Sequence, residues 1–108
     1  MAYPVEKAID KLKLMKFERV GTIKETIASQ SITTTTTLYE KSGIAFIILF
    51  HGNGDTSVTI KIYKNGTEID SLKGDQQAIE IQDTSTIKIT AEGSGNTPDI
   101  EVLRFYKY

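Results

Sequence analysis

Residues 44–50 form an unbroken apolar run, Ile-Ala-Phe-Ile-Ile-Leu-Phe. Successive side chains of a β-strand point to opposite faces of a sheet, so a strand with one wet face alternates between apolar and polar residues. Residues 57–64 alternate in this way, with Val58, Ile60 and Ile62 on one face and Thr59, Lys61 and Tyr63 on the other. The run at 44–50 does not alternate. We therefore expect both of its faces to be covered, the second by the chain's own N-terminus or by another protein.

The two faces of this strand carry side chains of different size. The face assigned to the core has the larger ones: Ile44, Phe46, Ile48 and Phe50. The other face has Ala45, Ile47 and Leu49. Leaving Ile47 and Leu49 in water would forgo about 1.5–3 kcal/mol each. Residues 100–108 are also two-sided, with Tyr106 and Tyr108 on one face and Leu103 and Phe105 on the other.

Length and charge exclude several classes of protein. A chain of 108 residues is one domain of ordinary size. A net charge of -1 argues against a dedicated nucleic-acid binder and against binding to an anionic membrane surface. The longest apolar run is far short of the ~20 residues that span a bilayer. Without cysteine the chain has no disulfide, thiolate metal site or cysteine nucleophile. The N-terminus lacks the pattern of a signal peptide, so we expect synthesis in the cytoplasm.

The N-terminal residues predict a helix over 4–16. Pro4 suits the first helical position, and one apolar stripe recurs at helical spacing: Val5, Ile9, Leu12 and Met15. We expect residues 1–16 to be a helical arm and residues 17–108 to be the β-sandwich domain. Residues 17–27 fit either a helix or an extended segment, and Gly21 with two threonines favours the extended one.

The remainder of the chain predicts short strands separated by turns. The expected strands are residues 32–39, 44–50, 57–64, 67–72, 77–82, 86–92 and 100–108, with turns at 40–43 and 51–55. Asn65-Gly66 is a strong hairpin signal. The fold class is therefore mainly β: an antiparallel β-sandwich, or a jelly-roll-like one, of seven or eight short strands with one N-terminal α-helix. A small closed barrel is the alternative.

No set of residues predicts catalysis, a cofactor or a metal. His51 is the only histidine, and it lacks a recognisable nucleophile and orienting acid. The glycine-rich residues 52–55 lack the alternating oxygen ligands of a calcium loop. A metal site built jointly by Asp55 with Asp75, Asp83 or Asp99 stays open. Residues 33–37, five consecutive threonines, fit either an edge strand or a ladder of hydroxyl groups for a sugar.

These observations lead to two hypotheses. The first is a non-enzymatic structural module that assembles with itself or with a protein partner through the apolar sheet face, the N-terminal helix or the C-terminal strand. Head decoration, head–tail and tail proteins of phages or prophages include small sandwiches of this kind. The expected interface residues are Val5, Ile9, Leu12, Met15, Ile47, Leu49, Tyr106 and Tyr108. The alternative is a glycan-binding sandwich that uses Tyr39 and Tyr63.

Overall fold

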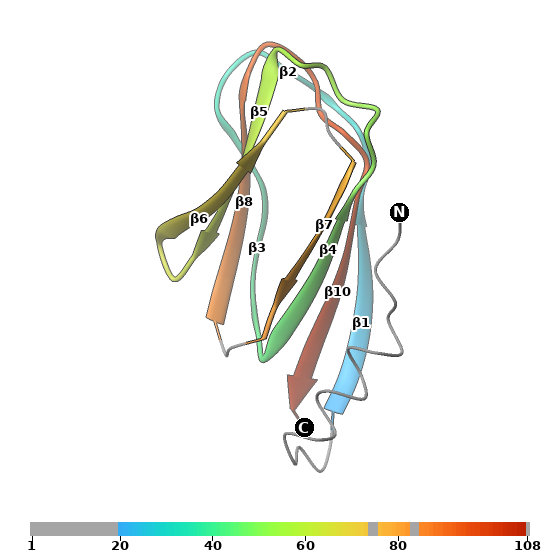
Figure 1. Cartoon of the computed structure of the whole chain (residues 1–108), viewed down its shortest axis with the longest axis vertical. Coiled ribbons are helices and arrows are strands. Elements are labelled where there is room, and N and C mark those ends of the chain that lie inside the picture. Colours follow the sequence, from blue (N-terminus) through green and yellow to red (C-terminus); the bar gives the residue numbers. More distant parts are fainter. Residues whose placement is uncertain (1–19, 74–75, 83–84, 108) are drawn as a thin grey trace.

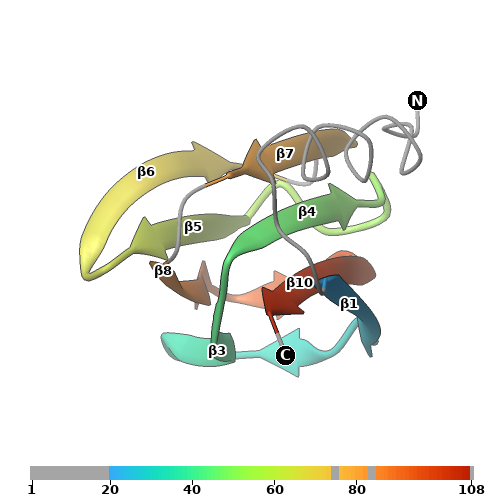
Figure 2. The ribbon, with the colours of Figure 1, turned by 90° about the horizontal axis from the view of Figure 1, so that it is seen from below.

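Two antiparallel four-stranded sheets lie face to face in the computed structural model, which describes residues 20–73, 76–82 and 85–107 (Figure 1, Figure 2). Sheet I has the order β1-β10-β4-β7, and sheet II has the order β3-β8-β5-β6. The short strands β2 and β9 pair with each other. The strands are β1 Val20–Ile27, β2 Ser31–Ile32, β3 Thr36–Gly43, β4 Ala45–Phe50, β5 Val58–Lys64, β6 Thr67–Leu72, β7 Gln77–Ile81, β8 Ser85–Gly93, β9 Gly95–Asn96 and β10 Ile100–Lys107.

The predicted antiparallel β-sandwich is confirmed. The extended interpretation of residues 17–27 is also confirmed from Val20 onward, where β1 pairs with β10 along its whole length. The predicted helix over 4–16, and with it the predicted boundary between residues 1–16 and 17–108, lies outside the described residues.

Strand pairing is nested along the chain. β1 pairs with β10, β3 with β8, β4 with β7 and β5 with β6, so each pair encloses the next in sequence. Successive pairs alternate between the two sheets, as they do when one long antiparallel hairpin is rolled up. All of the main ladders are therefore antiparallel, and the first and last strands lie side by side in sheet I.

The core lies between the two sheets and follows the predicted alternation. Sheet I contributes Phe46, Ile48 and Phe50 from β4, and sheet II contributes alternate isoleucines from β5 and β8: Ile60, Ile62, Ile87 and Ile89. All of these side chains are buried, and Ile81 and the partly buried Ile79 of β7 pack with them. The Asn65-Gly66 hairpin is also confirmed, because both residues have the positive φ angles of a type I′ turn, 51° and 86°.

The predicted turn at residues 40–43 is wrong. β3 continues through these residues to Gly43, and the chain passes from sheet II to sheet I at Ile44. The N–H of Ile44 donates to the carbonyl oxygen of Phe105 over 2.8 Å, which fixes this step. Because Ile44 precedes β4, its side chain packs with Ala45 and Ile47 on the outside of sheet I, and its assignment to the core is also wrong.

The threonine run is only partly a strand. Residues 33–35 connect β2 to β3, and β3 begins at Thr36. Ile32 is buried at the end of the core from the short β2–β9 pair, and the chain must then turn to enter sheet II. The β propensity of threonine is overridden here by the burial of its neighbour.

Candidate functional site: the outer face of sheet I

The outer faces of the two sheets have opposite character. On sheet II, Thr, Lys, Glu and Tyr side chains point outward, as the alternation of β5 and β8 requires. Lys61 Nζ lies 2.8 Å from a carboxylate oxygen of Glu92, and Lys88 Nζ lies 5.9 Å from the centre of the Tyr63 ring. On sheet I the central strands β4 and β10 instead present an apolar face, which consists of Ala45, Ile47, Leu49, Leu103 and Phe105.

The middle of the apolar face is dry. Phe105 is 0% exposed and Ile47 is 1% exposed, although both point away from the sandwich core. Leu49 and Leu103 are half-buried, and Val20 and Ile44 pack against the same cluster. The burial of Ile47 agrees with the unbroken apolar run at 44–50. The face is thus a dry centre with a partly exposed apolar rim.

The predicted interface residues do not all lie on this face. Ile47 and Leu49 do, together with Leu103 and Phe105, because the register pairs Leu103 with Ile47 and Phe105 with Ala45. Tyr106 lies on the other face of β10, where its ring covers Gly21 so closely that a Cβ there would overlap it. The remaining residues, Val5, Ile9, Leu12, Met15 and Tyr108, lie outside the described residues. Leu103 and Phe105 were missing from the predicted set, although the two-sided pattern of residues 100–108 marked them.

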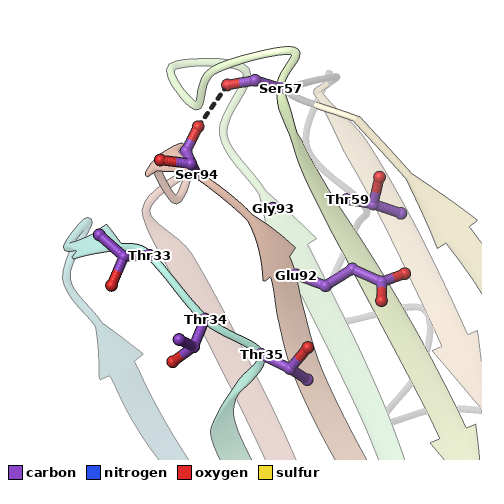
Figure 3. A pocket seen from close by; sticks show the side chains of 8 residues that line it. All are labelled: Thr33, Thr34, Thr35, Ser57, Thr59, Glu92, Gly93 and Ser94. Atoms are coloured by element: carbon purple, nitrogen blue, oxygen red, sulfur yellow. Dashed lines mark hydrogen bonds between the residues drawn. The ribbon is translucent and has the colours of Figure 1, made fainter.

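A polar groove lies at one end of sheet II (Figure 3). The hydroxyl groove, as we call it, has a volume of about 600 Å³ and is lined by Thr33, Thr34, Thr35, Ser57, Thr59, Glu92, Gly93 and Ser94. Figure 3 shows residues 33–35 on one side of Glu92 and Thr59 on the other. The Ser57 hydroxyl donates to the Ser94 carbonyl oxygen over 2.7 Å and so fixes the upper rim. This groove presents hydroxyl groups and one carboxylate to a polar ligand.

The two tyrosines expected to bind a glycan lie on opposite sides of sheet II. Tyr39 belongs to the core, is 6% exposed, and donates its hydroxyl to Glu25 Oε1 over 3.1 Å. Burial, and then the nearby Glu25 carboxylate, raise the pKa of Tyr39 above its ordinary value. Tyr63 is half-buried on the outer face, beneath Lys88. Neither residue lines the hydroxyl groove.

The loop acids bind backbone and amide groups. Asp55 Oδ2 accepts a hydrogen bond from the N–H of Asn96 over 2.7 Å, which ties the loop after β4 to the turn at β9. Asp99 accepts from the N–H of Ser29 and from the side-chain amide of Asn53, and these bonds lower the pKa of Asp99. Within 20–73, 76–82 and 85–107, no three His, Asp or Glu side chains gather as a metal site. Asp75 and Asp83 lie outside these ranges.

His51 lies near the carboxylates of Glu101 and Asp99. Its Nε2 lies 3.7 Å from Glu101 Oε1, at the end of the apolar face where Glu101 pairs with Leu49. This geometry places His51 beside the apolar rim.

Comparisons with known proteins assign this chain to no family. No protein-family model and no curated protein matches it. Among solved structures it is similar to the crystal structure of the infectious bursal disease virus VP2 subviral particle, with a TM-score of 0.37 and 14% sequence identity. The match covers 81% of this chain and 33% of that chain, so the chain spans about a third of the structure that it matches. The described residues contain no helix long and apolar enough to cross a membrane.

Proposed function

We propose that this chain is a non-enzymatic structural module that assembles with other protein subunits through the apolar face of sheet I. The observation that carries the proposal is the contrast between the two outer faces. Sheet II has a polar outer face of lysine, glutamate and threonine, whereas Leu49 and Leu103 form a half-buried apolar rim on sheet I. A contiguous apolar patch on the surface of a domain usually marks an interface.

The assembly that we propose is a virion, with the chain as a head decoration, head–tail or tail component of a phage or prophage. The nested pairing of β1 with β10, β3 with β8, β4 with β7 and β5 with β6 supports this. We interpret it as a jelly roll, an architecture of viral capsid and lectin domains. This part of the proposal is an analogy at the level of the fold.

We propose no catalytic role for the loop around His51. The nearby acids Asp55 and Asp99 each accept a backbone hydrogen bond that holds these loops in place. The polar groups that the structure describes there therefore support a role in shaping the loops.

The assembly proposal is tested by the native mass of the full chain over a series of concentrations. We expect masses above the 12.0 kDa of one chain that increase with concentration. Leu49→Asp and Leu103→Asp place a charge on the apolar rim and should lower the mass to that of one chain. Thr59→Asp, on the outer face of sheet II, is the matched control and should assemble normally. A monomer at every concentration, with no partner recovered from a native particle, would overturn the proposal.

A glycan-binding role is the second candidate, and the hydroxyl groove favours it. Thr33, Thr34 and Thr35 are exposed there, and the groove is also lined by Glu92, whose carboxylate can accept hydrogen bonds from sugar hydroxyls. On a glycan array, Thr34→Val and Thr35→Val should abolish binding because they remove the hydroxyls at nearly constant size. Tyr63→Ala, outside the groove, should leave binding unchanged. An array with no binding at all rejects this candidate.

A further inference from the structure

The burial of Phe105 requires a layer outside sheet I. Its neighbours across the ladder are Thr22 on β1 and Ala45 on β4, and both side chains are too short to lie over a phenyl ring. A ring that points out of a sheet is open to water from above unless another element packs on that face. Phe105 is nevertheless 0% exposed. Among the described residues, the side chains that pack around it, such as Val20 and Ile44, come from sheet I and the bend before β4.

The other outer face shows what an uncovered sheet looks like in the same molecule. Tyr63 points outward from β5 with the flexible Lys88 over its ring, and it is half-buried. On sheet I the dry residues Ile47 and Phe105 belong to the two central strands, and the half-buried Leu49 lies nearer to one end. The cover is therefore centred on β4 and β10.

We propose that residues 1–19 of the same chain are this cover and occupy the apolar face of the free subunit. The inference goes beyond the proposed function, in which the same face is the assembly surface. It adds what occupies that face in the free subunit.

The point of attachment favours this segment. Val20, where the described chain begins, packs against the apolar cluster. Residues 1–19 are therefore joined to the described chain at the rim of the face. Neighbouring strands are ~4.8 Å apart, so β4 lies ~10 Å from β1, two strands away. Residues 17–19 can span up to ~10 Å, and a helix over residues 4–16 would be ~20 Å long. The segment is long enough to cross the whole of sheet I.

The chemistry of the segment matches that of the face. Its expected apolar stripe, Val5, Ile9, Leu12 and Met15, would meet an apolar surface. Two carboxylates border that surface, since Glu80 is the cross-strand partner of Ile47 and Glu101 is that of Leu49. Residues 1–19 are rich in positive charge, with five basic residues against three acidic ones. A tethered segment also has an effective concentration in the millimolar range, which favours it over a second copy at ordinary protein concentrations.

A spin label on the full chain tests the inference. The chain has no cysteine, so Lys13→Cys, outside the expected apolar stripe, gives a single site for a nitroxide. We expect the label to broaden the backbone amide signals of Ile47, Leu49 and Leu103 until most of their intensity is lost. The amide signals of Lys61 and Lys88, on the far side of the sandwich, should keep their intensity.

The matched control carries Ile9→Asp and Leu12→Asp in addition to the labelled Lys13→Cys. It should lose the broadening at Ile47 while the signals of sheet II keep their positions, which would show that the fold is intact. A mixture of two kinds of chain shows whether the cover comes from the same chain or from a second copy. One kind carries the nitroxide without isotope enrichment, and the other is isotope-enriched without a nitroxide. Broadening in that mixture would assign the segment to a second copy and overturn the inference, as would equal broadening on both sheets.

The two experiments distinguish failure of this inference from failure of the proposed function. The native mass decides whether the chain assembles, whereas the spin label decides what covers the apolar face within one chain. A monomeric chain with local broadening at Ile47 would reject assembly and leave the intramolecular cover standing.

Discussion

Arg104 on β10 donates its Nε hydrogen to Oε1 of Glu25 on β1 over 2.8 Å. The Tyr39 hydroxyl, from β3 of sheet II, donates to the same oxygen, so one carboxylate connects the two sheets. The side chains of Arg104 and Glu25 are only 19% and 21% exposed, which weakens the competition from water. Arg104 also donates to the carbonyl oxygen of Ser42 over 3.2 Å. This network closes the β1–β3 side of the sandwich.

Glu25→Gln should lower the free energy of unfolding by about 1–3 kcal/mol, because it leaves the partly buried Arg104 guanidinium without a charged acceptor. Lys24→Gln is the matched control on the same strand. Its ammonium lies 4.0 Å from Glu101 and is well exposed, so its removal should cost less than about 1 kcal/mol. Chemical denaturation of both variants measures the difference, and equal losses would contradict the role of the network.

Tyr39 should make the protein less stable in strong alkali. Burial raises the pKa of Tyr39 above 10.0, its ordinary value, so the folded state keeps the phenol protonated where the unfolded chain releases the proton. The free energy of unfolding should therefore be unaffected by this group below pH 10 and fall as the pH rises toward the raised pKa. Chemical denaturation at a series of pH values measures how steeply the free energy of unfolding falls with pH. In Tyr39→Phe this fall should be smaller by the part that Tyr39 causes, and an unchanged fall would refute the prediction.

Asp99 should contribute to stability at neutral pH and lose that contribution in acid. The N–H of Ser29, and then the Asn53 amide, lower the pKa of Asp99 below 3.8, its ordinary value. Its contribution is present above that pH and is lost as the pH falls through the lowered pKa. Asp99→Asn should be less stable than the parent protein at neutral pH, and this difference in stability should become smaller in acid. Thermal unfolding of both proteins from neutral to acidic pH measures the difference. A difference that does not change with pH would contradict this account.

Gly66→Ala should cost about 1 kcal/mol of stability through the backbone alone. Gly66 has a φ of +86°, and a Cβ there would meet nothing within 4 Å, so no clash adds to the conformational strain. Gly52→Ala is the control, because Gly52 is exposed and has no positive φ. It should leave stability unchanged or raise it slightly. Urea denaturation compares the two, and a neutral Gly66→Ala would exclude a strained turn.

The alternation of side chains predicted most of the sandwich because it depends on which face is buried. In β5 and β8 every second residue is apolar, and these residues form the core. The turn predicted at residues 40–43 failed for a non-local reason. A bend at Ile44, bonded to the distant Phe105 carbonyl, replaces the turn, and no local pattern encodes that contact.

The apolar face was partly predictable and the hydroxyl groove was not. Ile47 and Leu49 follow from the lack of polar residues in one short run. Their association with Leu103 and Phe105 needed the register of β4 against β10, which sequence does not give. The hydroxyl groove brings together three segments far apart in the chain, at residues 33–35, 57–59 and 92–94. Only the folded arrangement of β3, β5 and β8 makes them neighbours.

The nested pairing has a consequence for synthesis on the ribosome. β1 is made first among the described strands, yet its one partner in sheet I is β10, the last of them to be made. Until residues 100–107 leave the exit tunnel, β1 has no ladder to join, and β4 lacks its neighbour on that side. Nascent chains should therefore stay sensitive to proteases and chaperones late into translation, and then complete sheet I in a single final step.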